Sequence, residues 1–134
     1  MSQVDSSRAR AETDEPPPWN AMLRTCPSRT SLVRIANKWT AMVVITLGDG
    51  PRRFGEIRTA LDGISAKVLT DTLRALEEDG IVTREVFAEV PPRVEYELTE
   101  LGHTLHAPLD ALRLWAETHI PEVLSARAAY AARE

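Results

Sequence analysis

Apolar side chains recur at helical spacing between residues 54 and 80, with one interruption by turn residues. This pattern predicts two helices joined by the turn Asp62-Gly63-Ile64. Ser65 is a good N-cap for the second helix. Gly80 stands where a left-handed C-cap is needed, so that Ile81 can pack back on the helix as in a Schellman motif. The side chains predicted to face inward are Phe54, Ile57, Leu61, Val68, Leu69, Leu73 and Leu76.

After these two helices the hydrophobic period becomes alternating. In residues 93–98 apolar and charged side chains alternate, which predicts a half-buried strand. The preceding strand, about residues 82–88, alternates less well because Arg84 falls among the apolar positions. Pro91 and Pro92 form the tip, where no ladder hydrogen bond needs their missing N–H groups. We therefore expect a mainly α (α+β) fold, a winged helix–turn–helix with a two-stranded β wing.

Further helices are expected on both sides of this segment. Pro27 suits the first position of a short helix, and Asn37 can cap the next one. The side chains that these two helices are expected to bury are Leu32, Val33, Ala36, Trp39, Met42, Val43 and Leu47. After the hairpin, Thr99 is expected to cap a long helix, Pro108 to kink it and Pro121 to begin a last helical piece. The apolar stripe of the long helix consists of Leu101, Leu105, Leu109, Leu112, Trp115 and Ala116.

The length of 134 residues predicts one domain. We expect a disordered segment at residues 1–22, which contains three consecutive prolines, a winged domain at 23–120 and a helical tail at 121–134. No apolar run reaches the roughly 20 residues that span a bilayer, and no stretch near the N-terminus suits a signal peptide. A lone cysteine excludes an internal disulfide and fits a reducing compartment, so the expected location is cytoplasmic.

The charge distribution is more informative than the net charge of -4, which by itself gives no support for DNA binding. Residues 24–53 carry six basic groups and one acidic group, so a local positive field is expected there. The basic groups are Arg24, Arg29, Arg34, Lys38, Arg52 and Arg53. The acidic residues of the second predicted helix gather at its C-terminal end, which would leave the groove if the helix entered N-terminus first.

The outward face of the second predicted helix carries side chains suited to a DNA groove. Lys67 and Arg74 can reach phosphates or guanine acceptors, and Thr70 can donate, accept or contact a thymine methyl group. Asp71 lies on the same face. Ser65 and the helix N-terminus suit a phosphate oxygen. Arg52, Arg53 and Arg93 are the candidate phosphate contacts, Arg93 beside the stiff wing tip. The alternative for this face is a set of solvated residues on an ordinary amphipathic helix.

The ordered set of motifs resembles the HxlR-type winged helix–turn–helix transcriptional regulators, within the broader MarR-like group. The motifs are Cys26-Pro27, Lys38-Trp39, Arg53-Phe54, Gly63-Ile64-Ser65, Leu73-Arg74 with Leu76-Glu77, Asp79-Gly80, Val90-Pro91-Pro92-Arg93-Val94-Glu95-Tyr96, and Leu98-Thr99-Glu100 before Gly102. The resemblance spans about residues 26–115. The chain departs from the family at Ala36-Asn37, where a Gly pair is usual.

The resemblance implies a homodimer on a palindromic double-stranded DNA operator, with the recognition helices in successive major grooves. It also implies dimerisation through the N-terminal and C-terminal helices. The expected interface residues are Leu32, Leu105, Leu109, Leu112 and Trp115. The apolar stripe of the long helix agrees, since it exceeds what so small a core can cover. The alternative is a monomer that folds the stripe onto its own first helices.

Cys26 is the candidate sensor. At the start of a helix, amide donors and the helix dipole favour a thiolate, and Arg24 and Arg29 add positive charge. The resemblance implies oxidant sensing for some family members with a matching cysteine; the alternative is a cysteine retained for packing. A small-molecule effector near Trp39 or Trp115 is a further hypothesis.

Neither a metal site nor a catalytic site is expected. His103 and His106 share a helix face, but no second cysteine and no carboxylate pair completes a metal site there. No nucleophile–base arrangement or phosphate-cradling glycine loop is present in the sequence. We therefore expect a DNA-binding regulator that is not an enzyme and needs no cofactor. The alternative function is a winged-helix protein-interaction module without DNA binding, which the acidic total and Asp71 favour.

Overall fold

The computed structural model describes residues 18–133. It divides into two compact units, residues 1–37 and residues 38–134, which we describe separately. The expected disordered segment at 1–22 lies mostly outside the described residues, because residues 1–17 are not among them.

The first unit contains helix α2 (Pro27–Ile35), which begins at Pro27 as predicted. The predicted burial of Leu32 and Val33 is wrong, since these side chains are 49% and 66% exposed. The helix has only nine residues, and residues 18–25 form turns without a second layer of structure. Within the described part of this unit, α2 therefore has nothing to bury its apolar residues against.

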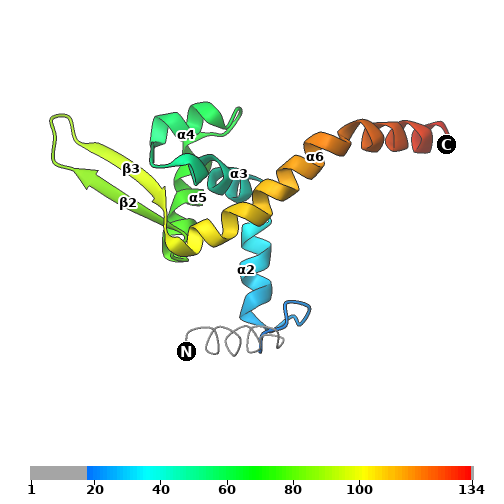
Figure 1. The fold of residues 1–134 in the computed structure, drawn as a ribbon, viewed down its shortest axis with the longest axis horizontal. Helices are drawn as coiled ribbons and strands as arrows, with labels where there is room; N and C mark the ends of the chain where they lie inside the picture. The colour runs from blue at the N-terminus through cyan, green and yellow to red at the C-terminus, as the bar shows by residue number, and fades with distance from the viewer. Residues whose placement is uncertain (1–17, 134) are drawn as a thin grey trace, which may run out of the picture. The chain divides into compact units, whose positions relative to one another are not determined.

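The second unit is a winged helix–turn–helix, as predicted. It consists in order of α3 (Lys38–Thr46), a 3₁₀ turn η1 (Leu47–Asp49), strand β1 (Arg52–Arg53), α4 (Phe54–Ala60), α5 (Ala66–Glu78), β2 (Val82–Phe87), β3 (Arg93–Leu98) and α6 (Glu100–Ala132). In Figure 1 the β2–β3 hairpin extends from one end of this unit and the C-terminal part of α6 extends from the other.

The core lies where α3, α4 and α5 meet the base of the hairpin. Its fully buried side chains are Val43, Val44, Leu47, Ile57, Leu69, Leu73 and Val82. Two expectations are corrected here. Val68 is 37% exposed while Thr72 is buried in its place, since the Thr72 hydroxyl donates to the Val68 carbonyl oxygen at 2.7 Å and satisfies its polar group. Met42 is 40% exposed, and Val44 occupies the core instead.

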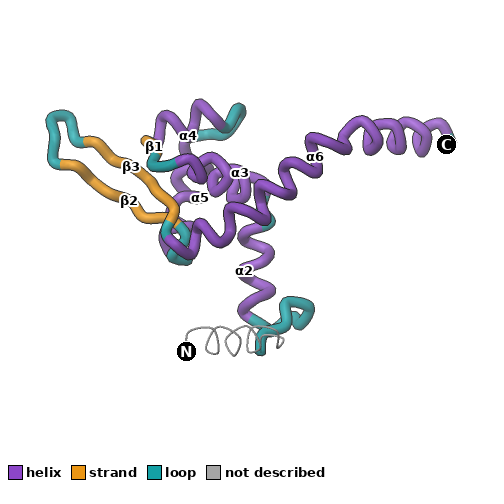
Figure 2. Tube along the Cα trace, viewed as in Figure 1, coloured by secondary structure: helices purple, strands orange, loops and turns teal. Residues whose placement is uncertain are grey.

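The hairpin belongs to a three-stranded antiparallel sheet of order β1-β3-β2, shown in orange in Figure 2. Val82 pairs with Leu98 at the base of the hairpin, and Phe87 pairs with Arg93 near its tip. The sequence pattern did not predict strand β1, because a strand of two residues shows no alternation of apolar and polar positions. Its arginines pair with Tyr96 and Glu95 of β3.

The predicted caps of α5 are confirmed. The Ser65 hydroxyl accepts from the Val68 N–H at 3.1 Å. At the other end the Ile81 N–H donates to the Leu76 carbonyl at 2.9 Å and the Gly80 N–H donates to the Glu77 carbonyl at 3.1 Å. These are the two hydrogen bonds of a Schellman motif, and they require the left-handed φ of 74° at Gly80.

Helix α6 begins at the predicted N-cap and continues past both prolines. The Thr99 hydroxyl accepts from the Gly102 N–H at 3.0 Å. Gly102 lies so close to the Ile81 carbonyl that a Cβ at this position would collide with it, which ties the start of α6 to the end of α5. The helix runs without a break from Glu100 to Ala132, so Pro121 does not begin a separate piece. No helix within residues 18–133 is long and apolar enough to cross a membrane.

Candidate nucleic-acid interface

The exposed face of α5 is the centre of the candidate interface. Lys67, Asp71 and Arg74 lie at i, i+4 and i+7, so they form one stripe along the helix, and all three are exposed. Ala66 at the first helical position is small, so the backbone at the N-terminal end of the stripe can approach a surface closely. The side chains that sequence reasoning assigned to the groove therefore do share one accessible face.

Two hydroxyl groups of this helix are already used by its backbone. The Thr70 hydroxyl donates to the Ala66 carbonyl at 2.8 Å, so its remaining capacity is to accept a hydrogen bond or to offer its methyl group. The Ser65 oxygen accepts from Val68 as the N-cap, which leaves the Ser65 O–H free to donate. Ser65 can thus cap the helix and contact a phosphate oxygen at the same time.

A carboxylate pairs with the first cation of the stripe. Lys67 Nζ lies 2.9 Å from Asp71 Oδ2, with the two side chains 85% and 57% exposed. Such an exposed pair contributes only about 0.3–0.5 kcal/mol to helix stability. Its consequence for the interface is that the carboxylate on the stripe is hydrogen-bonded to one of the two cations that share its face.

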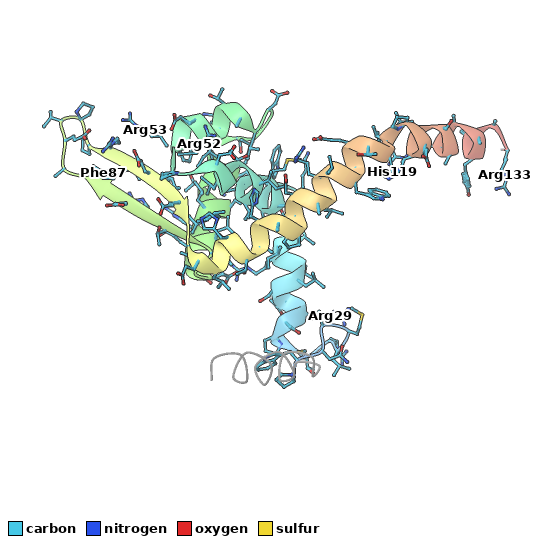
Figure 3. All side chains as sticks on the ribbon, in the orientation of Figure 1. Arg29, Arg52, Arg53, Phe87, His119 and Arg133 are labelled. Atoms are coloured by element: carbon cyan, nitrogen blue, oxygen red, sulfur yellow. The ribbon has the colours of Figure 1, made fainter. Side chains whose placement is uncertain are left out.

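Arg52 and Arg53 form β1 and lie beside the hairpin, as Figure 3 shows. The Arg53 side chain is exposed. Its backbone N–H donates to Glu56 Oε1 at 2.8 Å and closes the first turn of α4, so this N–H is not available to a surface partner. Arg52 is partly buried and lies 3.9 Å from the Asp49 carboxylate. Both guanidinium groups are therefore placed next to the wing by backbone pairing rather than by a flexible loop.

Arg93 is held by its own hairpin. Its guanidinium lies 4.1 Å from the centre of the Phe87 ring, 3.3 Å from Glu89 Oε1 and 3.5 Å from Glu95 Oε2. Its Nε is buried and lacks a hydrogen-bond partner among the described residues. The side chain is only 28% exposed. To contact a phosphate, Arg93 would have to leave Glu89 or Glu95. In this structure its contacts instead join residues of its own hairpin.

The thiol of Cys26 lies within a small polar cluster of the first unit. Cys26 Sγ is 3.0 Å from Ser28 Oγ, and it accepts from the Asn20 N–H at 3.3 Å. The hydrogen bond with the Ser28 side chain is the main reason that the pKa of Cys26 lies below its usual range. Partial burial opposes the shift, while the backbone N–H groups of Ser28, Asn20 and Arg29 support it. Sequence reasoning predicted the direction but missed the Ser28 hydroxyl.

The predicted interface residues of α6 differ in their exposure. Leu109 is 8% exposed and belongs to the core of its own unit. Leu112 and Trp115 are 61% and 55% exposed, and Trp115 contacts the His119 ring at 5.3 Å between centroids. Leu105 is half-buried.

A mostly apolar groove of about 500 Å³ lies between α3 and α6. Its lining residues are Lys38, Ala41, Met42, Ile45, Thr46, Leu61, Leu109, Leu112, Arg113, Ala116 and Glu117. Arg113 is held by Asp110 and Glu117 at 2.7 Å each, and Asp110, through this hydrogen bond, has a pKa below its usual range.

The histidines form no cluster of metal ligands. Residues 18–133 contain no group of three or more His, Cys, Asp or Glu side chains that could hold a metal ion. His106 packs instead against Gly48, where a Cβ would collide with the imidazole ring.

Comparison with known proteins agrees with this architecture. A curated relative from Escherichia coli (strain K12), the uncharacterized HTH-type transcriptional regulator YtfH, is 38% identical over 127 residues, covering 95% of this chain and 96% of the relative. The solved structure of the transcriptional regulator ytfH from Salmonella typhimurium has a TM-score of 0.77 and 38% identity, covering 82% of this chain and 98% of that one. The redox regulator HypR in its reduced form has a TM-score of 0.68 and 40% identity, covering 74% and 98%.

The family model described as HxlR-like helix-turn-helix matches residues 34–123, which include every element from α3 to β3 and most of α6. The winged fold, the relatives and this match agree with one another, and the chain belongs to the HxlR-like helix-turn-helix family of transcriptional regulators.

Proposed function

We propose that this regulator binds duplex DNA in a sequence-specific manner, with α5 in the major groove and the β2–β3 hairpin as the wing. The observation that carries the proposal is the exposed stripe of Lys67, Asp71 and Arg74 on the second helix of a helix–turn–helix. A helix of this kind fits the major groove, and its cations match phosphate oxygens and guanine acceptors.

Each interface residue has a role in the proposal. Lys67, Thr70, Asp71 and Arg74 face the base edges, while Ser65 donates to a phosphate at the start of α5. Arg52 and Arg53 contact the backbone beside the wing. Arg93 positions the wing tip and reaches a phosphate only by leaving Glu89 or Glu95.

The active form in the proposal is a homodimer on a palindromic or near-palindromic operator, in the cytoplasm with the chromosomal DNA. The exposed Leu112 and Trp115 of α6, with the half-buried Leu105, supply apolar surface in the second unit, and Leu32 of α2 supplies it in the first. Two recognition helices would then lie about 34 Å apart, one turn of DNA, in successive major grooves.

Two routes for a regulatory signal are supported by separate features. The lowered pKa of Cys26 favours a thiolate that reacts with oxidants, and the similar protein HypR is described as a redox regulator. The groove between α3 and α6 has the size and apolar lining of a small-molecule site. The first route is the stronger, because the thiol has a built hydrogen-bond environment.

The decisive test measures binding of the full chain to random-sequence and selected duplex DNA as the salt concentration rises. A DNA-binding protein loses affinity steeply, because its cations release counterions from the phosphates. Arg74→Ala should cost about 1–3 kcal/mol on the selected operator and much less on random DNA if Arg74 reads a base. Absence of binding at low salt would instead favour a winged-helix protein-interaction module.

A further inference from the structure

The carboxylate of Asp71 is unusual on a surface that is proposed to meet DNA. It lies on the exposed stripe of α5 between Lys67 and Arg74, and its side chain is 57% exposed. The other acidic residues of this helix, Glu77 and Glu78, lie at its C-terminal end. The phosphates repel a carboxylate at this position, and a hydrogen-bond donor on the DNA that faces Asp71 would offset that repulsion.

Cytosine is the base whose major-groove edge fits a carboxylate. Guanine presents two acceptors there, and thymine presents an acceptor and a methyl group. Adenine presents a donor but places the N7 acceptor next to it, which a carboxylate would face directly. Cytosine presents the N4 amino donor and no acceptor. An acceptor-only side chain therefore distinguishes cytosine from the other three bases.

The neighbouring residues of the stripe favour Asp71 as the side chain that accepts a hydrogen bond from cytosine. Lys67 Nζ contacts Asp71 Oδ2 at 2.9 Å, which reduces the charge that the phosphates meet and leaves the second carboxylate oxygen available to accept. Lys67 and Arg74 are donors only, and they suit guanine. The Thr70 hydroxyl is bonded to the Ala66 carbonyl. Of the stripe, Asp71 is the one acceptor-only side chain.

We propose that Asp71 selects cytosine at one position of each operator half-site by accepting a hydrogen bond from its N4 amino group. This inference rests on the proposed DNA-binding function and adds the identity of a base to it. Lys67 donates one hydrogen bond to the carboxylate that makes the contact and keeps its other N–H groups for the DNA.

The test is selection of operators from random duplex DNA by the full chain, its Asp71→Asn variant and its Glu77→Gln variant. Glu77→Gln is the matched control, because it removes the same charge from an exposed position of the same helix away from the stripe. The wild type should enrich cytosine at one position of each half-site. Asp71→Asn should lose that preference or change it to adenine, which an amide fits, while all other positions keep theirs. Glu77→Gln should select the wild-type operator.

Binding measurements on the selected operator complete the test. Replacing the cytosine pair by a thymine pair should weaken wild-type binding roughly ten-fold or more, and should hardly affect Asp71→Asn. Cytosine selection that persists in Asp71→Asn overturns the inference and leaves the DNA-binding function intact. A uniform rise in the affinity of Asp71→Asn for all sequences also overturns the inference, because it would mean that Asp71 only repels phosphate. If the wild type enriches no sequence, the proposed function and this inference both fail.

Discussion

Several cations of the candidate interface have carboxylate partners within their own chain. Lys67 is paired with Asp71, and Arg93 is held by both Glu89 and Glu95. A phosphate that binds either side chain must compete with these partners, so the gain is smaller than for a free cation. In a chain of net charge -4 we expect this pairing to weaken nonspecific attraction to DNA, so that specific contacts would have more weight in the total affinity.

The acidity of Cys26 depends on Ser28, and this leads to a prediction about pH. The Ser28 hydroxyl is the largest cause of the lowered pKa, so its loss in Ser28→Ala should raise the pKa toward the ordinary thiol value of about 8.5. A smaller fraction of the thiol is then ionised at pH 7. The rate of alkylation by iodoacetamide, measured from pH 5 to 10, should have a higher midpoint in the variant.

Arg24→Gln is the control for Ser28→Ala, because it changes the same segment without touching the thiol's hydrogen bonds, and Arg24 is not among the causes of the lowered pKa of Cys26. Its alkylation midpoint should stay close to that of the wild type. Equal midpoints in Ser28→Ala and the wild type would show that the hydroxyl does not stabilise the thiolate.

At the scale of the element, Ser65 caps α5 and is also the proposed phosphate contact, and substitutions can separate these two roles. Ser65→Ala removes the hydrogen bond to the Val68 N–H and should destabilise the protein by about 1 kcal/mol. Ser65→Asp keeps a good N-cap, so thermal unfolding should occur near the wild-type temperature. The new carboxylate would repel a phosphate, however, so DNA affinity should fall in Ser65→Asp despite the normal stability.

The comparison of the two Ser65 variants depends on measuring unfolding and DNA binding on the same samples. If Ser65→Asp binds DNA as well as the wild type does, no phosphate lies at the start of α5. In that case Ser65 is a structural cap and nothing more.

Caps and turns were the elements that the sequence predicted best. The caps at Ser65, Gly80 and Thr99 are made by hydrogen bonds that join residues three to five positions apart, so the residue types alone identify them. Strand β1 escaped prediction because its pairing with β3 joins residues more than 40 positions apart. The contact of Arg93 with Phe87 escaped for a similar reason, since Phe87 of β2 meets Arg93 of β3 only once the hairpin has formed.

At the scale of the whole molecule, the long apolar stripe of α6 serves two purposes. Leu109 is buried in the winged unit, whereas Leu112 and Trp115 are exposed on the same helix. Exposed apolar side chains of this size, gathered on one helix, are typical of a surface that another chain covers. The stripe could be found in the sequence, but its division between core and surface depends on which residues meet α3.

We therefore expect the double variant Leu112→Gln with Trp115→Gln to be a folded monomer. Neither side chain contributes to the buried core, so the helical circular dichroism signal should be retained. The loss of the second DNA-binding unit should weaken binding to a palindromic operator roughly a hundred-fold or more, because the avidity of two linked sites disappears. Sedimentation equilibrium at micromolar concentration measures the first effect, and operator titration measures the second.

Leu109→Ala provides the contrast that makes this result interpretable. It lies one turn before Leu112, but it is buried, so the substitution should destabilise the unit by about 2–5 kcal/mol and lower the unfolding temperature. If Leu112 and Trp115 instead belonged to the core of the protomer, the double variant would unfold as Leu109→Ala does. If it remained a dimer with normal operator affinity, another surface would hold the two copies together, and α6 beyond Leu109 would not be the interface.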